Sequence, residues 1–411
     1  MPTMKSEKFN LYDDALVLLI ARWIVAQDSL SEIKDLLFSR QVNWEKVQAL
    51  LSFHEISSLA YPCLKNLATL IPSLELEKLR HLHYCAVANL LEKENEFCEI
   101  SIYLGNANID LVPLKGMAFL FDRIYGGLTG LRSMADIDIL VKKERLSDVE
   151  RILTSSGYQK ELGGLKESYW LNNNYHLKFA KSFSPNRSSL LEVHWLLDYP
   201  RKIDLLPHLW DRVRQVTSED KKINLLSPEE TLFCLVLHLR RFGRVLSLKS
   251  ACDCACLLSK YKNLDWDYIL KESKRGEMCA SLYFRLIQAN LFFGLQIPKL
   301  VFKEISFFGS RNLIKEFILK NTFRTQQGKD NVIFLKHHFL VYDTIRDSAK
   351  MVVNMPQEQF AKFFQIPPYN FLTKILYLSR LVYLPYYAFT LLVRTVICKI
   401  CKILMRIMGF Q

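Results

Sequence analysis

The spacing of apolar residues changes from helical to strand-like between residues 109 and 196, and this change limits the folds open to the chain. Apolar and polar residues alternate there in short runs, which predict strands at 109–114, 136–141, 176–179 and 190–196. Residues 117–123 and 144–155 keep helical spacing, and Gly157 stands where a glycine is expected just after a helix. Strands and helices in this order predict a compact α/β unit.

Helical spacing dominates on both sides of that unit, over residues 11–105 and again from 228 to about 293. The second stretch opens with Ser227-Pro228-Glu229-Glu230, in which serine caps the helix and proline takes its first position. Glycine (14) and proline (13) are sparse in 411 residues, which disfavours an all-β, turn-rich fold. We therefore predict an α+β protein with a small mixed sheet, flanked by N- and C-terminal helical regions.

The chain is long enough for two or three folding units. Half of its residues are hydrophobic and 24% are charged, a balance typical of globular rather than disordered proteins. We predict four parts: an N-terminal helical region (1–105), an α/β core (106–215), a C-terminal helical domain (225–345) and a basic amphipathic tail (356–411).

Asp136 and Asp138 stand two residues apart in an otherwise apolar strand that runs to Val141. Side chains two apart on a strand point to the same face, and unpaired carboxylates are costly to bury. A divalent cation between them would offset that cost, and Mg²⁺ prefers oxygen ligands of this kind. The alternative is a solvated pair, or one bound to Arg132, and for an isolated Asp-x-Asp that alternative is the commoner outcome.

Two further features lie on the same α/β unit. Lys115-Gly116 occupies the turn from the first strand into a helix, where glycine lets the backbone approach a ligand and the helix N-terminus offers N–H groups to phosphate. Glu192 lies on the last strand and would become a third carboxylate of the site if that strand pairs beside Asp138. An ordinary turn, and an exposed strand face carrying Glu192 and His194, are the alternatives.

In this order the motifs resemble a bacterial nucleotidyltransferase family of the polymerase-beta-like superfamily, often found with surface-polysaccharide and peptide-modification genes. Its members carry Leu-Lys-Gly, then an arginine shortly before Asp-Ile-Asp-Leu-Leu-Val, then an acidic residue two positions before His-Trp. The corresponding residues here are Leu114-Lys115-Gly116, Arg132, Asp136-Ile137-Asp138-Ile139-Leu140-Val141 and Glu192-Val193-His194-Trp195. The resemblance covers roughly residues 95–295 and extends to Gly157-Tyr158, His238 and Asp253.

The resemblance implies a nucleotidyltransferase-like fold and a Mg²⁺-dependent enzyme that moves a nucleotidyl group from ATP or another NTP to an acceptor hydroxyl. That acceptor would be a small molecule, a sugar or a peptide. The implied catalytic residues, which would also bind two Mg²⁺ ions, are Asp136, Asp138 and Glu192. The implied nucleotide-binding residues are Lys115, Gly116 and Arg132. Where the wider superfamily has Gly-Ser, this chain has Gly116-Met117, so backbone N–H groups and Lys115 would hold the phosphates.

Two other functions stay open. The same site could serve a phosphotransferase acting on a peptide hydroxyl, or the fold could persist in a non-catalytic, antitoxin-like or scaffolding protein. Three retained carboxylates argue against the non-catalytic alternative. Nucleic acid is not an expected partner, because the basic residues alternate with aliphatic ones instead of grouping beside exposed aromatic side chains.

The net charge of +13 is concentrated near the C-terminus, where no acidic residue follows Glu358. The basic residues there are Lys362, Lys374, Arg380, Arg394, Lys399, Lys402 and Arg406. The longest uncharged run, Leu381 to Val393, is 13 residues, short of the roughly 20 that a spanning helix needs. We expect residues 371–410 either to lie in the plane of an anionic membrane surface or to cover the protein's own core with a solvated basic face.

The first ten residues lack the apolar segment of a secretory signal, and the ten cysteines have no disulfide-framework spacing. Buried, reduced thiols are therefore expected instead of disulfides or a zinc site. We expect a cytoplasmic protein, and of the two alternatives for its tail one would associate it with a membrane surface.

Overall fold

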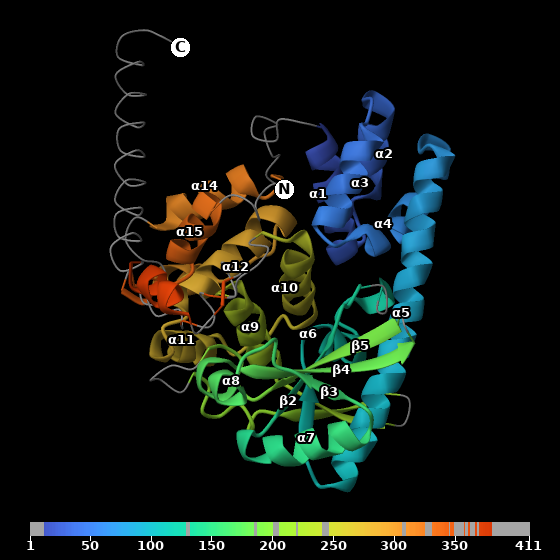
Figure 1. The fold of residues 1–411 in the computed structure, drawn as a ribbon. Helices are drawn as coiled ribbons and strands as arrows, with labels where there is room; N and C mark the ends of the chain where they lie inside the picture. The colour runs from blue at the N-terminus through green and yellow to red at the C-terminus, as the bar shows by residue number, and fades with distance from the viewer. Residues whose placement is uncertain are drawn as a thin grey trace. The chain divides into compact units, whose positions relative to one another are not determined.

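The computed structural model describes residues 12–128, 132–184, 187–199, 205–218, 221–240, 246–305, 310–324 and 331–344, with shorter stretches between 346 and 379. The chain divides into two compact units, residues 1–343 and 344–411. The first unit contains the sheet and all the labelled helices from α1 to α15 (Figure 1).

The central sheet has five strands in the order β1-β2-β5-β4-β3. The strands are β1 (Leu111–Pro113), β2 (Ile137–Val141), β3 (Gln159–Glu161), β4 (His176–Ser184) and β5 (Arg187–His194). β2 and β5 run parallel, whereas the other neighbours are antiparallel. The small mixed sheet and the flanking helices confirm the predicted α+β fold class.

The two faces of β2 have different chemistry. Ile137, Ile139 and Val141 join the main apolar core, together with Leu191 and Val193 of the neighbouring strand. Helix α7 (Leu146–Ser155) covers part of this core with Val149 and Leu153, and ends before Gly157, whose φ of 89° is left-handed. The alternate residues of β2, Asp138 among them, therefore leave the sheet on the opposite face.

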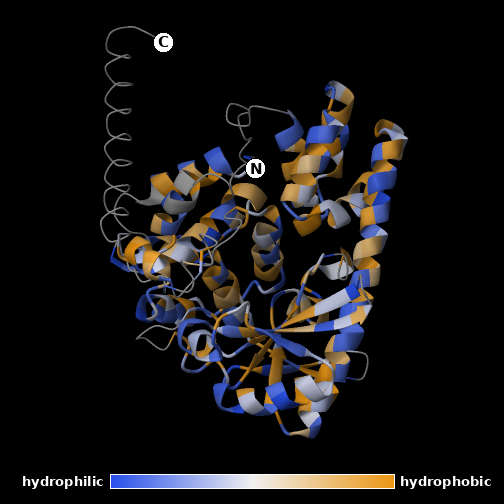
Figure 2. Cartoon of the chain, viewed as in Figure 1, coloured by the Kyte–Doolittle hydropathy of each residue, from blue (hydrophilic) through white to orange (hydrophobic). Residues whose placement is uncertain are grey.

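The helices before the sheet are α1 (Tyr12–Ala26), α2 (Leu30–Ser39), α3 (Trp44–Phe53), α4 (Ser57–Leu64) and the 34-residue α5 (Ser73–Asn106). Helix α5 contacts α4 near one end and β1 and α7 near the other, so it links the N-terminal helices to the sheet (Figure 1). Hydrophobic and hydrophilic stretches alternate along it (Figure 2). Asn89 of α5 donates a hydrogen bond to the Met134 carbonyl at 2.8 Å, which ties the helix to the segment before β2.

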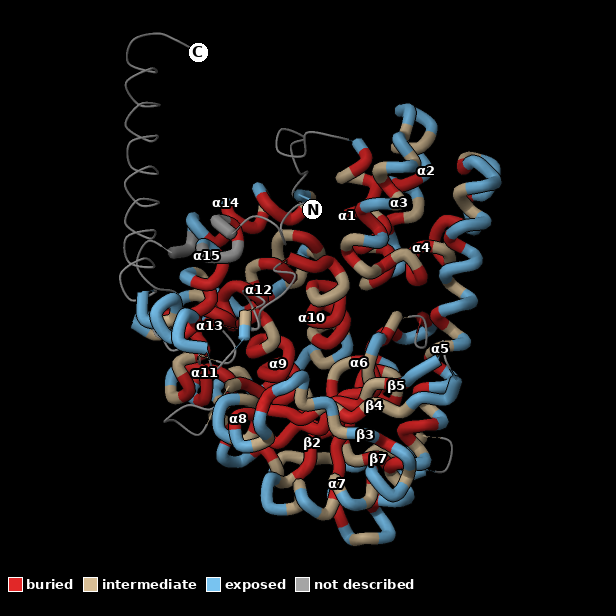
Figure 3. Tube along the Cα trace, in the orientation of Figure 1, coloured by how far each residue is buried: buried red, intermediate tan, exposed pale blue. Residues whose placement is uncertain are grey.

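The helices after the sheet are α9 (Pro228–Leu237), α10 (Leu248–Lys260), α11 (Trp266–Arg275), α12 (Cys279–Phe293), α13 (Lys299–Glu304), α14 (Ser310–Asn321) and α15 (Asn331–Leu340). The predicted start of α9 is confirmed, because the Ser227 side chain accepts from the Glu230 N–H. Helix α10 contacts both α1 and α12 and is buried over most of its length (Figure 3). The described cysteines are all free thiols.

Four elements have no counterpart in the sequence-based prediction. They are β3, α8 (Glu167–Asn173) and the two-stranded hairpin of β6 (Arg214–Ser218) and β7 (Lys221–Leu225). β3 is polar throughout and sits at the sheet edge, so it has no apolar alternation to detect. The predicted domain boundaries inside residues 1–345 stay a prediction.

Residues 371–379 of the second unit form a helix, and the remainder of the predicted tail, 380–411, lies outside the described residues. Over the part of the chain that the structure describes, no helix combines the length and apolarity needed to cross a membrane.

Two buried histidines on α15 are expected to make the stability of the fold depend on pH. Burial lowers the pKa of His337 to about 3 and that of His338 to about 4. In the unfolded chain both imidazoles bind a proton near pH 6.5. The part of the stability that depends on these two neutral histidines is therefore fully present above pH 6.5 and falls as the pH drops toward 4. We expect His337 alone to contribute a loss of about 3 kcal/mol between pH 7 and pH 4.5, measured by denaturant unfolding at both values.

The variant His337→Phe should lose correspondingly less stability over the same pH interval. His208, whose side chain is 65% exposed, supplies the matched control His208→Asn, which should behave as the wild type. An equal loss in the wild type and in His337→Phe would show that this histidine does not cause the pH dependence.

Candidate active site

The pairing of β2 with β5 brings carboxylates together from distant parts of the chain. Asp138 lies opposite Glu192 in this parallel pair, and paired residues of neighbouring strands point to the same face. Asp136 directly precedes β2 and stands two residues before Asp138. Each of the three residues offers a carboxylate oxygen, and these oxygens all lie within 4.8 Å of one another. We call Asp136, Asp138 and Glu192 the carboxylate group.

Lys115 lies directly beside the carboxylate group. It is the first residue of α6 (Lys115–Phe121), and its φ of 48° is left-handed, which is uncommon for a residue with a side chain. The N–H of Leu114 donates to the Asp138 carbonyl at 2.9 Å and fixes this turn against β2. The Lys115 ammonium forms an ion pair with Asp138 and lies 3.9 Å from Oε2 of Glu192.

The three carboxylates differ in their electrostatic surroundings. Burial by itself would raise the pKa of Asp138, but Lys115 and His194 outweigh it and hold that pKa below its ordinary value. Burial of Glu192 is likewise outweighed by His194, His176 and Lys115, and its pKa is lowered. Burial and the charge of Asp138 raise the pKa of Asp136. Asp138 and Glu192 are therefore held ionised, and ionised carboxylates are the form that binds a cation.

Gly116 allows a close approach between α6 and the segment before β2. A Cβ atom at this position would lie 2.2 Å from Sδ of Met134 and 2.6 Å from Nη1 of Arg132. Both distances are shorter than any van der Waals contact, so a larger residue here would force the side chains of Met134 and Arg132 to move. The sequence predicts glycine here for the approach of a ligand to the backbone, and we propose that role in addition to the packing against Met134 and Arg132.

Gly116→Ala is expected to destabilise the protein by about 1–3 kcal/mol, because Met134 and Arg132 would have to move. Gly105 near the end of α5 is the matched control, since no atom lies within 4 Å of the Cβ that alanine would add there. Gly105→Ala should stabilise by about 0.5–1 kcal/mol. Urea unfolding of both variants checks the prediction, and equal effects would contradict the packing role of Gly116.

Arg132 is held by a residue of the helical region after the sheet. Its guanidinium donates to both carboxylate oxygens of Asp253 on α10, at 2.6 and 2.8 Å, and Tyr125 donates to the same carboxylate at 2.6 Å. Arg132 is therefore paired with Asp253 and not with Asp136 or Asp138, which was the alternative that the sequence left open. The bidentate pair fixes the guanidinium and ties α10 to the segment before β2.

Three basic or titratable residues near the site were missed by the sequence-based argument. His176 and Lys178 lie on β4 opposite His194 and Glu192, and Lys178 Nζ is 3.0 Å from Oε1 of Glu192. The alternation of polar and apolar residues around His176 and Lys178, followed by a polar segment before Arg187, could have predicted their position. Such a pattern indicates a hairpin, and the hairpin turn fixes which residues of the two strands face one another. Lys93 on α5 is buried, and its charge acts to lower the pKa of Asp136. No sequence pattern around Lys93 predicts that it lies near Asp136.

The comparison with known protein families covers the part of the chain that contains this site. The sequence model of a family described as an uncharacterised nucleotidyltransferase matches residues 40–294. The chain belongs to this family. The match extends over helices α3 to α12, and so includes the sheet, the carboxylate group and Asp253. No curated protein matches the chain. Membership in the nucleotidyltransferase family gives the general reaction class and leaves the metal, the donor and the acceptor undefined.

Proposed function

We propose that the protein is a Mg²⁺-dependent enzyme that transfers a nucleotidyl group from ATP or another NTP to an acceptor hydroxyl. The observation that carries this proposal is the grouping of Asp136, Asp138 and Glu192, whose oxygens lie within 4.8 Å of one another. Family membership supplies the reaction class, and the carboxylate group supplies the chemistry that such a reaction needs.

The donor set fits a hard divalent cation. Three carboxylates converge, and Mg²⁺ is bound in phosphate-transfer sites by one or two carboxylates together with substrate phosphates. Asp136, Asp138 and Glu192 would hold the ions, with two ions expected from the reaction class. When bound, Mg²⁺ would offset the negative charge of the phosphates and of the leaving pyrophosphate.

The remaining residues have separate roles in the proposed reaction. The acceptor oxygen attacks the α-phosphorus, the bond to the β-phosphate oxygen breaks, and pyrophosphate leaves. Glu192 would receive the hydroxyl proton. Lys115, at the N-terminus of α6, would pair with the triphosphate, and the backbone N–H of Gly116 would donate to it. Arg132 contributes positive charge near the phosphates while Asp253 fixes its orientation.

The products distinguish this reaction from phosphoryl transfer to a peptide hydroxyl by the same site. Nucleotidyl transfer adds a nucleoside monophosphate to the acceptor and releases pyrophosphate, whereas phosphoryl transfer adds one phosphate and releases a nucleoside diphosphate. We propose to incubate the full chain with Mg²⁺, each NTP in turn and a cell lysate, and to search for either mass increment. An acceptor that gains the mass of a nucleoside monophosphate, with release of pyrophosphate, supports the proposal. An acceptor that gains the mass of one phosphate would replace the proposal with phosphoryl transfer.

We further propose a cytoplasmic enzyme whose C-terminal tail binds an anionic membrane surface. Exposed apolar side chains occur along residues 371–379, and they are Phe371, Leu372, Ile375, Leu376 and Leu378. Basic residues of the remaining tail would add about 1 kcal/mol each at an anionic surface.

Neutralising Arg394, Lys399, Lys402 and Arg406 with glutamine in the full chain is therefore expected to abolish flotation with anionic vesicles. Vesicles of neutral lipid serve as the control and should bind neither protein. Equal flotation of the two proteins would show that these four charges do not bind the membrane, and failure of the wild type to float would favour the alternative, a helix that covers the protein itself.

A further inference from the structure

A second cluster of metal-binding side chains shares Glu192 with the carboxylate group. His176, Glu192 and His194 each offer one ligand atom, and these atoms lie within 4.8 Å of one another. We propose that the three side chains form a site for an imidazole-binding divalent cation of the Zn²⁺, Fe²⁺ or Co²⁺ class. We call these residues the histidine group.

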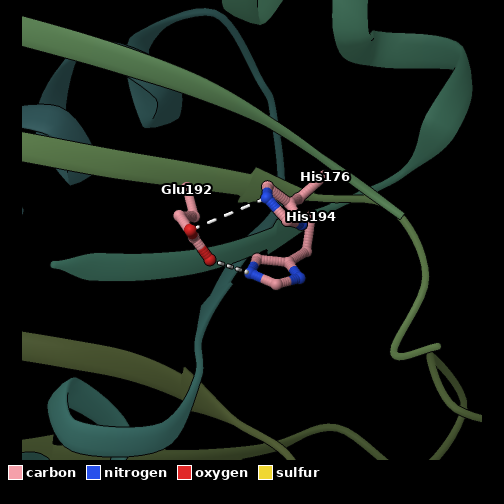
Figure 4. Close-up of side chains that lie close together, drawn as sticks. All are labelled: His176, Glu192 and His194. Atoms are coloured by element: carbon pink, nitrogen blue, oxygen red, sulfur yellow. Dashed lines mark ion pairs between the residues drawn. The ribbon is translucent and has the colours of Figure 1, made fainter. Parts of the chain in front are cut away.

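Strand pairing creates the histidine group. His176 of β4 lies opposite His194 of β5, and Glu192 is two residues before His194, on the same face of the sheet. Figure 4 shows the two imidazoles directed at different oxygens of the Glu192 carboxylate. The paired strands β4 and β5 therefore present all three donors, and metal sites are best built on such regular elements.

The distances within the group suit a shared ion better than direct hydrogen bonds. Nε2 of His176 is 3.6 Å from Oε1 of Glu192, and Nε2 of His194 is 3.5 Å from Oε2. Good hydrogen bonds between nitrogen and oxygen end at about 3.2 Å. Ligands about 2.0–2.1 Å from a tetrahedral metal are separated by about 3.3–3.4 Å. A small movement of these side chains would complete the coordination.

Burial and aromatic packing enclose the histidine group. All three residues are buried, and the ring of Tyr175 stacks on His194 with centroids 5.6 Å apart. Nε2 of His194 now lies 2.9 Å from Oδ1 of Asp138, in hydrogen-bonding range. Among the described residues Nδ1 of His194 has no hydrogen-bond partner, and Nε2 is the ring nitrogen that faces the carboxylates.

Charged groups of both signs surround the histidine group. The carboxylate group lies beside the ammonium groups of Lys115 and Lys178, and the charge of Lys93 acts on Asp136. Lys178, whose side chain is 35% exposed, can turn toward solvent when an ion approaches Glu192. Two imidazoles and one carboxylate form a donor set that zinc and iron sites use, whereas Mg²⁺ prefers all-oxygen ligands.

Cobalt is the probe of choice because its spectrum reports its ligands. Co²⁺ is titrated into the full chain with excess Mg²⁺ and without NTP, while calorimetry records affinity and visible absorption records the ligand field. We expect His176→Asn and His194→Asn to weaken Co²⁺ binding at least about tenfold. His208→Asn should bind as the wild type does, and Asp136→Asn should lose Mg²⁺ affinity while retaining Co²⁺.

Unchanged Co²⁺ affinity in both histidine variants, or charge-transfer bands from cobalt–thiolate bonds, would overturn the proposal. If the histidine variants do not fold, pulsed electron–nuclear resonance on the Co²⁺-loaded wild type decides. Coupling to imidazole nitrogen supports the histidine group, and its absence rejects it. Because no NTP is present, the outcome is independent of the proposed transfer activity.

Discussion

Replacing Asp138 by asparagine is expected to lower nucleotidyl turnover by about 10³-fold or more. Asp138 is buried, accepts from Lys115 and His194 and lies opposite Glu192. In the proposed reaction its charge would bind the cation, and loss of several kcal/mol of transition-state stabilisation corresponds to this factor. Pyrophosphate release under saturating Mg-ATP measures turnover, and isothermal titration of Mg-ATP measures the accompanying loss of binding.

The matched control is Asp110→Asn, the same chemical change at a carboxylate whose side chain is 63% exposed. Asp110 directly precedes β1 and pairs only with Lys142, at 3.5 Å, among the described residues. Its replacement should change turnover less than twofold. If folded Asp138→Asn turns over as fast as the control, the carboxylate group is not the catalytic centre.

Replacing Asp253 by alanine is expected to destabilise the protein by about 3–5 kcal/mol. Asp253 accepts two hydrogen bonds from Arg132 and one from Tyr125 in a buried setting. Without the carboxylate, the Arg132 guanidinium would be left as an uncompensated charge beside Gly116. Denaturant unfolding at neutral pH measures the free energy, and Mg-ATP binding should weaken in the same variant because Arg132 loses its orientation.

Asp148 on α7 provides the comparison for an exposed ion pair. It is paired with Arg145 and Arg151, and its side chain is 43% exposed. Asp148→Ala should cost less than about 1 kcal/mol, because surface ion pairs contribute little in water. A similar loss at both positions would mean that the Arg132–Asp253 pair is no more important to stability than a surface pair.

Local periodicity predicted the strands that carry the site. The alternation around Asp136 and Asp138 located β2, and the alternation around Glu192 located β5. The hairpin of β6 and β7 was missed: it forms a separate two-stranded sheet, and its partly exposed strands contain mostly polar residues. Propensity and pattern find strands that bury one face, and they overlook strands held mainly by backbone hydrogen bonds.

The role of Gly116 shows where the sequence-based argument was incomplete. A glycine at a strand-to-helix turn was expected to admit a ligand, and the structure gives it a second reason, the contact with Met134 and Arg132. Arg132 itself was expected near phosphate or paired with the aspartates, and it is paired with Asp253, 121 residues away. Partners so distant leave no local pattern.

The sequence by itself located four of the five strands of the central sheet and the residue types they carry, because apolar periodicity and turn residues act over a few neighbouring positions. The tertiary structure decided which strands pair, and therefore which charges meet. His194 reaches Asp138 across 56 residues, and His176 faces His194 only because β4 folds back on β5. The physical reason is that pairing is selected by burial of the whole core and by compensation of buried charge, which depend on every element at once.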